Sequence, residues 1–321
     1  MVIFLVLLLL LVAELSLREY HRRTRNEALP TRLRPETRAV TWEDIRNRYR
    51  IVCLGDSITH GNELPYNQSY PAVLDDLLRR RHPDLDAFVI NAGICGHTSV
   101  QGLARLERDV LWYQPHAVVV SFGLNDGNLG YWPLDSTRER PMWGRLHLRE
   151  RMDAMLRSSH LYLTIRGRMR RVLRRLGWLD RPVPTSTDGF PQSRVTRDGF
   201  ALAQERLVGR IHESGCPTVF LATMTPVADV FPAELGPHLQ QRQLQIYQEY
   251  NHIVRSIAER SGAHLLDLQV SFANHSMGES LPLQMDDGVH LTPAGEQLIA
   301  LAVMQALEDT GLPSSEPDRR R

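Results

Sequence analysis

Five short apolar runs, each followed by a stretch with helical spacing, constrain the fold of this chain more than any other feature. The runs are IVCLG, AFVIN, AVVVSF, TVFLAT and HLLDL, at residues 51–55, 87–91, 117–122, 218–223 and 264–268. Strands that are apolar on both faces and alternate with helices are typical of a parallel sheet covered on both sides. The sequence therefore predicts an α/β fold with a five-stranded parallel sheet.

The spacing of apolar residues predicts helices between and after these strands. The expected helices span residues 69–81, 99–113, 196–213 and 239–261. A last helix, TPAGEQLIALAVMQAL, begins with Thr292 as its N-cap, Pro293 at the first helical position and Glu296 in the first turn.

The alternation stops between about residues 127 and 191, where we expect a helical insertion. It holds the arginine-rich amphipathic stretch SSHLYLTIRGRMRRVLRRLGWL. Such a helix either packs its apolar face on the domain, which is the commoner arrangement, or lies on anionic lipid as a lid or membrane-surface helix.

The N-terminus, MVIFLVLLLLLVA, has no polar face. Counted through residue 17 at roughly 1.5 Å per residue, it reaches about 25 Å, short of the roughly 30 Å hydrocarbon core of a bilayer. It lacks the basic region and cleavage site of a signal peptide, so we expect an uncleaved membrane anchor. The arginines after it favour a cytoplasmic domain, although a start codon assigned too far downstream would hide a basic region before the apolar stretch and reverse that orientation.

These patterns divide the chain into an anchor, a linker, one folded domain and a tail. The expected boundaries are 1–17 for the anchor, 18–48 for the linker, 49–311 for the domain and 312–321 for the polar tail.

Composition excludes several classes of function. A formal net charge of +1 argues against a nucleic-acid-binding protein. All 38 basic residues are arginines, so lysine chemistry such as a Schiff base is excluded. Cys53, Cys95 and Cys216 lack CxxC spacing, and neither a zinc site nor a disulfide framework is indicated. We expect no metal and no cofactor.

Polar residues gather where the predicted strands end, which is where ligands bind in open α/β sheets. The first strand ends on Asp56 and Ser57, the second runs into NAGICGHTS, and the third into FGLND. A late loop reads DDGVHLTP. Each motif alone could be an ordinary turn, but together they supply the parts that acyl transfer requires.

Each of these residue types has a role in that chemistry. A serine hydroxyl becomes a nucleophile when a base takes its proton, and histidine suits this task near neutral pH. His290 is the candidate base for Ser57, and Asp287 is the carboxylate that would orient it. The Ser57 N–H, the Gly96 N–H and the Asn125 side-chain amide are candidate donors to an oxyanion.

Neighbouring polar residues have simpler expected roles. Asp56 is expected to brace its turn and Asp126 to structure its loop, whereas Asp286 lacks the D-x-x-H spacing that Asp287 has. The expected bystanders on the same loops are His60, His97 and Cys95.

The segments GDSIT, NAGICGHTS, GLND and DGVHLTPAG resemble the four sequence blocks of the SGNH hydrolase superfamily, the GDSL esterases and lipases. The resemblance spans essentially residues 50–308, and the continuation VQGLARL is similar to bacterial thioesterase/lysophospholipase members. It implies a flavodoxin-like three-layer α/β/α sandwich with strand order 2-1-3-4-5. It also implies Ser57 as nucleophile, Asp287 and His290 as its partners, and Gly96 and Asn125 in the oxyanion hole.

The predicted function is that of a metal-independent serine hydrolase that cleaves carboxylic esters through an acyl-enzyme. A lipid-like ester fits the anchor and the basic insertion, and a small acyl group on a polysaccharide, removed by an O-deacetylase, fits equally well. An O-acyltransferase would use the same site, with a sugar or lipid hydroxyl in place of water. A non-catalytic membrane scaffold is disfavoured because every catalytic residue type is present.

Overall fold

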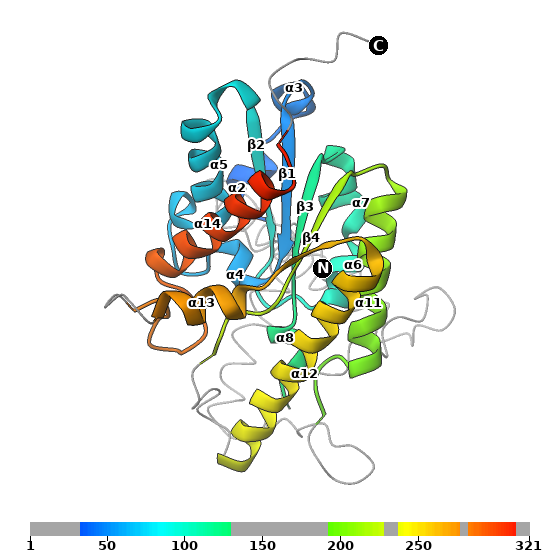
Figure 1. Cartoon of the computed structure of the whole chain (residues 1–321), viewed down its shortest axis with the longest axis vertical. Helices are drawn as coiled ribbons and strands as arrows, with labels where there is room; N and C mark the ends of the chain where they lie inside the picture. The colour runs from blue at the N-terminus through cyan, green and yellow to red at the C-terminus, as the bar shows by residue number, and fades with distance from the viewer. Residues whose placement is uncertain (1–32, 130–191, 228–236, 277–281, 313–321) are drawn as a thin grey trace, which may run out of the picture. The chain divides into compact units, whose positions relative to one another are not determined.

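Five parallel strands form the central sheet of the computed structural model, which describes residues 33–129, 192–227, 237–276 and 282–312. The strands are β1 (Tyr49–Gly55), β2 (Ala87–Gly93), β3 (Ala117–Ser121), β4 (Thr218–Ala222) and β5 (His264–Leu266). They lie in the order β2-β1-β3-β4-β5, and every neighbouring pair is parallel (Figure 1). The predicted sheet and its order are therefore confirmed.

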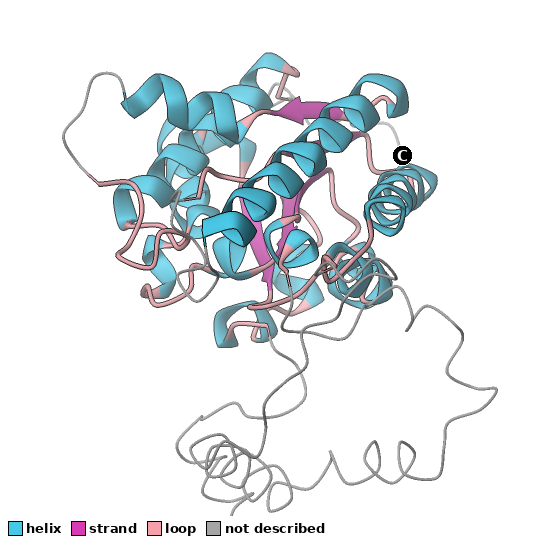
Figure 2. Ribbon diagram, turned by 90° about the horizontal axis from the view of Figure 1, so that it is seen from below, coloured by secondary structure: helices cyan, strands magenta, loops and turns pink. Residues whose placement is uncertain are grey.

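Helices cover both faces of this sheet. The longer ones are α5 (Tyr70–Arg81), α11 (Arg197–Glu213), α12 (Pro237–Ser261), α13 (Leu268–Ser276) and α14 (Pro293–Asp309). α5 packs with α14, and α11 packs with α12, so the helices form two separate layers. Figure 2 shows the strands between helices on either side, which confirms the predicted three-layer sandwich.

The central strands are apolar on both faces because both faces are covered. Ile51, Val52, Cys53 and Leu54 of β1 are all fully buried, and so is the middle of β3. A strand with one solvated face would alternate polar and apolar residues, whereas a strand between two helix layers does not.

The helix expected over 99–113 is broken in the structure. It forms α6 (Ser99–Ala104), α7 (Leu106–Asp109) and a 3₁₀ turn (Leu111–Tyr113). The break falls at Arg105, whose buried side chain donates to the Gly55 carbonyl and to the Asp109 carboxylate. The break thus coincides with the residue whose guanidinium reaches the end of β1.

The domain also begins earlier than the sequence pattern predicts. Residues 33–48, expected as part of a linker, include α2 (Pro35–Arg38) and α3 (Trp42–Ile45). Leu33 and Ile45 are buried in the main core. Two isolated apolar side chains between polar residues leave no periodic pattern, so the sequence does not reveal this packing.

Residues 1–32 and 130–191, with the anchor and nearly all of the insertion, lie outside the described residues.

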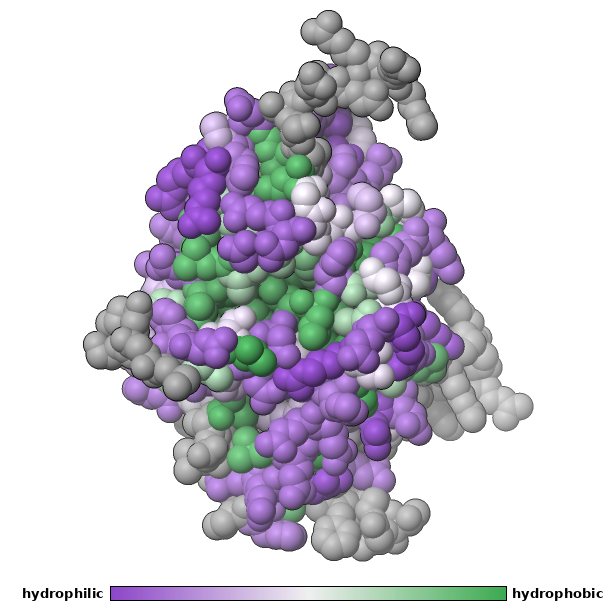
Figure 3. All heavy atoms as spheres, viewed as in Figure 1, coloured by the Kyte–Doolittle hydropathy of each residue, from purple (hydrophilic) through white to green (hydrophobic). Residues whose placement is uncertain are grey.

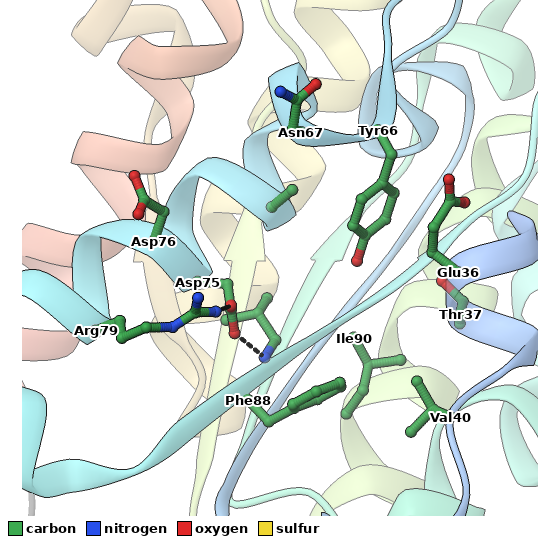
Figure 4. Close-up of a pocket in the computed structure, with 12 residues that line it drawn as sticks. Glu36, Thr37, Val40, Tyr66, Asn67, Asp75, Asp76, Arg79, Phe88 and Ile90 are labelled. Carbon is green, nitrogen blue, oxygen red and sulfur yellow. Dashed lines mark hydrogen bonds and ion pairs between the residues drawn. The ribbon is translucent and has the colours of Figure 1, made fainter. Parts of the chain in front are cut away.

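Side chains occupy the free edge of β2. The Asp75 carboxylate of α5 accepts the Val89 N–H at 3.0 Å, and the Thr37 hydroxyl donates to the Asn91 carbonyl at 2.7 Å. These bonds protect an edge that could otherwise pair with another strand. Asp75 and Tyr66 both line a hollow of about 570 Å³, and Figure 4 shows the two side chains. None of the predicted site residues lines this hollow.

The surface is mostly polar over α12, and apolar side chains gather between α14 and α12 on the same face (Figure 3). Leu265 of β5 and Val270 of α13 are among the exposed large apolar residues. Within the described ranges, no helix has both the length and the apolarity that crossing a bilayer requires.

Candidate active site

Ser57 stands at the carboxyl end of β1, as the first residue of the short helix α4 (Ser57–His60). The preceding Asp56 caps this helix, since its carboxylate accepts the Ile58 N–H at 3.0 Å. Gly61 ends the helix in the left-handed region, at φ +70°. The strand, the cap and the glycine together form a tight turn that presents the serine, which is only 9% exposed.

Two arginines hold this turn through its backbone carbonyls. Arg105 donates to the Gly55 carbonyl at 3.0 Å, just before the turn. Arg34 donates to the carbonyls of His60 and Gly61, at 2.6 Å and 3.2 Å, just after Ser57. A planar guanidinium has five N–H donors and can bind several carbonyls at once. These bonds therefore fix both ends of the Ser57 turn.

The structure brings the three predicted residues of the nucleophile, base and acid together. His290 Nε2 lies 3.0 Å from Ser57 Oγ, and His290 Nδ1 lies 2.5 Å from Asp287 Oδ2. A carboxylate can only accept, so Nδ1 carries the proton and Nε2 is left to accept from the serine hydroxyl. Asp287, and not Asp286, makes this bond.

The loop that carries His290 is held by local bonds. Asp287 Oδ1 accepts the N–H groups of Val289 and His290, at 3.0 Å and 2.9 Å. The Met285 N–H donates to the His290 carbonyl at 2.7 Å. The side chain of Asp287 is 44% exposed and that of His290 is 22% exposed. The histidine is therefore accessible yet oriented by its own loop.

Two carboxylates near Ser57 have opposite pKa shifts. Burial raises the pKa of Asp56 to about 6, and hydrogen bonds from Ile58 and Asn125 oppose that rise only in part. The pKa of Asp287 lies below its usual value. Partial burial alone would raise it, but the hydrogen bonds from the Val289 N–H and from His290 stabilise the charged form by more. Asp287 is thus the carboxylate that stays charged beside the histidine.

The candidate oxyanion donors lie on three neighbouring loops. Asn125, in α8 (Leu124–Gly127), donates one amide N–H to Asp56 Oδ2 at 3.2 Å and keeps a second N–H for a ligand. The Ser57 N–H lies in the first turn of α4, where a helix supplies no acceptor. Gly96 follows β2, is exposed, and has the left-handed φ of +75° that favours glycine.

Asp126 has the structural role that was expected of it. It is fully buried, and it accepts the backbone N–H and the hydroxyl of Ser99, at 2.9 Å and 2.5 Å. Burial raises its pKa to about 7. The bond ties the loop of Asn125 to the loop that follows Gly96.

Asn62 is a neighbour of the site that the sequence motifs did not indicate. Its side-chain amide nitrogen lies 3.5 Å from His290 Nε2, and its amide oxygen accepts from the Cys95 thiol. It follows Gly61 in the chain, and no sequence pattern distinguishes it. Burial raises the pKa of Cys95 to about 11, so this thiol is protonated at neutral pH.

His60 and His97, which were expected as bystanders, lie on the same loops. His60 Nδ1 lies 3.2 Å from the Gly93 carbonyl, and His97 follows Gly96 on its loop. The described part of the chain contains no group of three or more His, Cys, Asp or Glu residues arranged to hold a metal ion.

Solved structures of the same architecture support the fold assignment. One is an alpha/beta hydrolase enzyme from the metagenome of Lake Arreo, Spain. It aligns with a TM-score of 0.51 and 23% identity over 83% of this chain and 97% of its own. At that identity, the similarity concerns the fold alone.

Two curated relatives match a shorter stretch. An arylesterase of Vibrio mimicus is 37% identical over 84 residues, which is 26% of this chain and 41% of the relative. A thioesterase 1/protease 1/lysophospholipase L1 of Escherichia coli strain K12 is 39% identical over 83 residues, 26% of this chain and 38% of the relative. The chain thus spans about two fifths of the length of these relatives.

A family-wide comparison covers far more of the chain. The sequence model of the GDSL-like Lipase/Acylhydrolase family matches residues 53–298. This match includes the Ser57 turn, both loops of the candidate oxyanion donors, and the Asp287–His290 loop. The resemblance seen in the four motifs is confirmed, and the chain belongs to the GDSL-like lipase/acylhydrolase family.

Proposed function

We propose that this protein is a serine hydrolase that cleaves carboxylic esters through an acyl-enzyme. The observation that carries the proposal is the continuous hydrogen-bonded chain from Ser57 Oγ through His290 to Asp287. A weakly nucleophilic hydroxyl bonded to a histidine that a carboxylate orients is the arrangement that activates serine for acyl transfer.

Acylation begins when Ser57 Oγ attacks the carbonyl carbon of the ester and its proton passes to His290 Nε2. The Asp287 carboxylate stabilises the imidazolium that forms. The carbonyl oxygen becomes an oxyanion, to which Ser57 N–H, Gly96 N–H and Asn125 Nδ2 donate. The intermediate collapses as the C–O bond to the alcohol breaks, and His290 returns the proton to the leaving oxygen.

Deacylation repeats these steps with water in place of serine. His290 Nε2 takes a proton from the water as its oxygen attacks the acyl carbon. The same three donors stabilise the second oxyanion. The bond to Ser57 Oγ then breaks, the carboxylic acid leaves, and the serine regains its proton from the histidine.

The substrate is proposed to be a lipid-like or small acyl ester. The names of the relatives, an arylesterase and a thioesterase/lysophospholipase, support ester or thioester cleavage without distinguishing among alcohols. Among the described residues of the site, Gly96 is exposed and His290 is partly exposed.

Hydrolysis of p-nitrophenyl esters from acetyl to palmitoyl by the full chain tests this proposal, with Ser57→Ala as the control. We expect turnover that the substitution abolishes. A maximum at long chains indicates lipids, and a maximum at acetate indicates deacetylation. Turnover that persists in Ser57→Ala would overturn the proposal, and transfer to an added alcohol without hydrolysis would favour the acyltransferase.

We also propose that residues 1–17 hold the enzyme at a membrane, with the catalytic domain on the cytoplasmic side. The support is the continuous apolar run of residues 1–13 and the arginines that follow the segment. Fractionation of cells that express the full chain, with and without residues 1–17, tests the attachment. Recovery of both forms in the soluble fraction would contradict it, and protease protection of sealed vesicles reports the side.

A further inference from the structure

The loop that carries Gly96 has little steric support at the glycine itself. A methyl group built on Gly96 would meet no atom within 4 Å, and its φ is +75°. Since glycine has no side chain, no side-chain packing fixes its backbone dihedrals, and the direction of its N–H depends on how the loop around it is held. Hydrogen bonds to the surrounding loop must therefore determine the direction of the Gly96 N–H.

Arg194 makes the closest of those bonds. Its Nη1 donates to the Gly96 carbonyl at 2.6 Å, and its Nη2 donates to Gln101 Oε1 at 3.0 Å. Gln101 Oε1 also accepts the Thr98 N–H at 3.1 Å, which ties the same guanidinium to the next part of the loop. Arg194 is only 6% exposed, so water competes little for these bonds.

The backbone around Arg194 is attached to the loop of the second donor. The Arg194 N–H donates to the Asn128 carbonyl at 3.0 Å, and the Val195 N–H donates to the Asp126 carbonyl at 2.9 Å. Asp126 directly follows Asn125. One residue thus connects the loop of the Gly96 N–H with the loop of the Asn125 amide.

We propose that Arg194 is a positioning residue of the oxyanion hole. The inference rests on the proposed function, since it concerns the same oxyanion. Arg194 touches no reacting atom; its bonds to the Gly96 carbonyl and to Gln101 hold in place the loop that presents the Gly96 N–H, next to the loop of Asn125. The planar fork of arginine makes both bonds from two nitrogens at once, whereas the donors of lysine all lie on one nitrogen and do not reproduce this geometry.

Steady-state kinetics of Arg194→Met and Arg194→Lys in the full chain test this inference. We expect kcat to fall roughly 10- to 100-fold in Arg194→Met, because a misdirected donor loses part of the 10²- to 10³-fold that one oxyanion donor supplies. KM should stay within about twofold, and Arg194→Lys should recover part of kcat. The acid limb of the pH profile should not move, since His290 is unchanged.

Arg50 provides a matched control. It is also a buried arginine that donates to backbone carbonyls, those of Ile45, Arg46 and Arg48, but it does so at the opposite end of β1 from Ser57. Arg50→Met should lower Tm and leave kcat per active site within about twofold. Titration of Ser57 with a fluorophosphonate counts the folded active sites in every variant.

Affinity for an alkylboronic acid gives a second readout, because its adduct with Ser57 is tetrahedral and puts an oxygen in the oxyanion hole. We expect Arg194→Met to weaken this affinity in parallel with its loss of kcat/KM. Equal kcat in Arg194→Met and Arg50→Met, or a rise in KM alone, would overturn the inference while wild-type turnover continued. A wild type without Ser57-dependent turnover would overturn the proposed function as well.

Discussion

The two regions that meet at Ser57 Oγ are built in different ways. The serine turn is buried, and residues distant in the sequence hold it: Arg34 and Arg105 bind its backbone, and Asn125 binds Asp56. The Asp287–His290 loop is partly exposed, and most of its bonds lie within five residues.

Because of this difference, substitutions in the two regions should affect folding stability and catalysis to different degrees. A substitution in the Asp287–His290 loop removes few contacts of the core and should act mainly on catalysis. A substitution in the serine turn disturbs packing among β1, β2 and α4 and should affect both activity and folding. Substitutions in each region can distinguish the two effects.

Substitutions in the exposed loop should cause the largest loss of activity. We expect His290→Ala to lower kcat roughly 10⁶-fold, as loss of the base does in a serine protease. Asp287→Asn should lower it about 10⁴-fold, because the amide favours the wrong tautomer of the histidine. Calorimetry should show Tm within a few degrees of the wild type for both. A large fall in Tm would contradict the separation.

Removal of one oxyanion donor should cost less. Asn125→Ala is expected to lower kcat about 10²- to 10³-fold, the usual effect of losing one such donor. Because Asn125 also donates to Asp56, this variant should lose some thermal stability too. Asn67→Ala, at an exposed position in the 3₁₀ turn Tyr66–Gln68, is the control and should match the wild type in both assays.

Overpacking beneath the serine turn should reduce stability and activity together. A methyl group on Gly93 of β2 would come within 2.2 Å of the His60 backbone nitrogen, so Gly93→Ala must push α4 away from the sheet. We expect a loss of about 1–3 kcal/mol in urea unfolding and a clear fall in kcat. Gly209→Ala in α11, where a methyl group meets nothing within 4 Å, should not destabilise the protein. Wild-type activity in Gly93→Ala would argue against a rigid turn.

The pH dependence of stability should show a graded effect, small for any one group over a single pH unit. Burial raises the pKa of Asp56 to about 6, of Asp126 to about 7 and of Glu296 to about 8. Between the unfolded value near 4 and these values the folded state holds the extra protons, so stability falls as pH rises. Each proton contributes about 1.4 kcal/mol per pH unit at most.

Tm measured from pH 5 to pH 8 checks this sign. We expect Tm to fall over that range and the slope to flatten in Glu296→Gln, which can still accept the Tyr70 N–H that Glu296 binds at 2.7 Å. A Tm that stays flat from pH 5 to pH 8 would show that these carboxyl groups are already ionised in the folded protein.

Much of the fold was predictable because burial leaves a pattern in the sequence. All five strands were located from apolar runs, and the capping pattern at Thr292 was correct, since its hydroxyl accepts the Gly295 N–H. The break at Arg105 and the packing of residues 33–48 were not predictable. Each depends on one or two side chains whose partners are supplied by other parts of the chain.

The sequence by itself determined what is local: the apolar runs of the strands, the tight turn at Ser57, and the spacing that joins Asp287 to His290. Only the tertiary structure decided which distant groups meet. His290 reaches Ser57 across 233 positions of the chain, and Arg194 reaches Gly96 across 98. Local conformation follows from neighbouring side chains, whereas a contact between loops exists only once the strands that carry them have taken their order in the sheet.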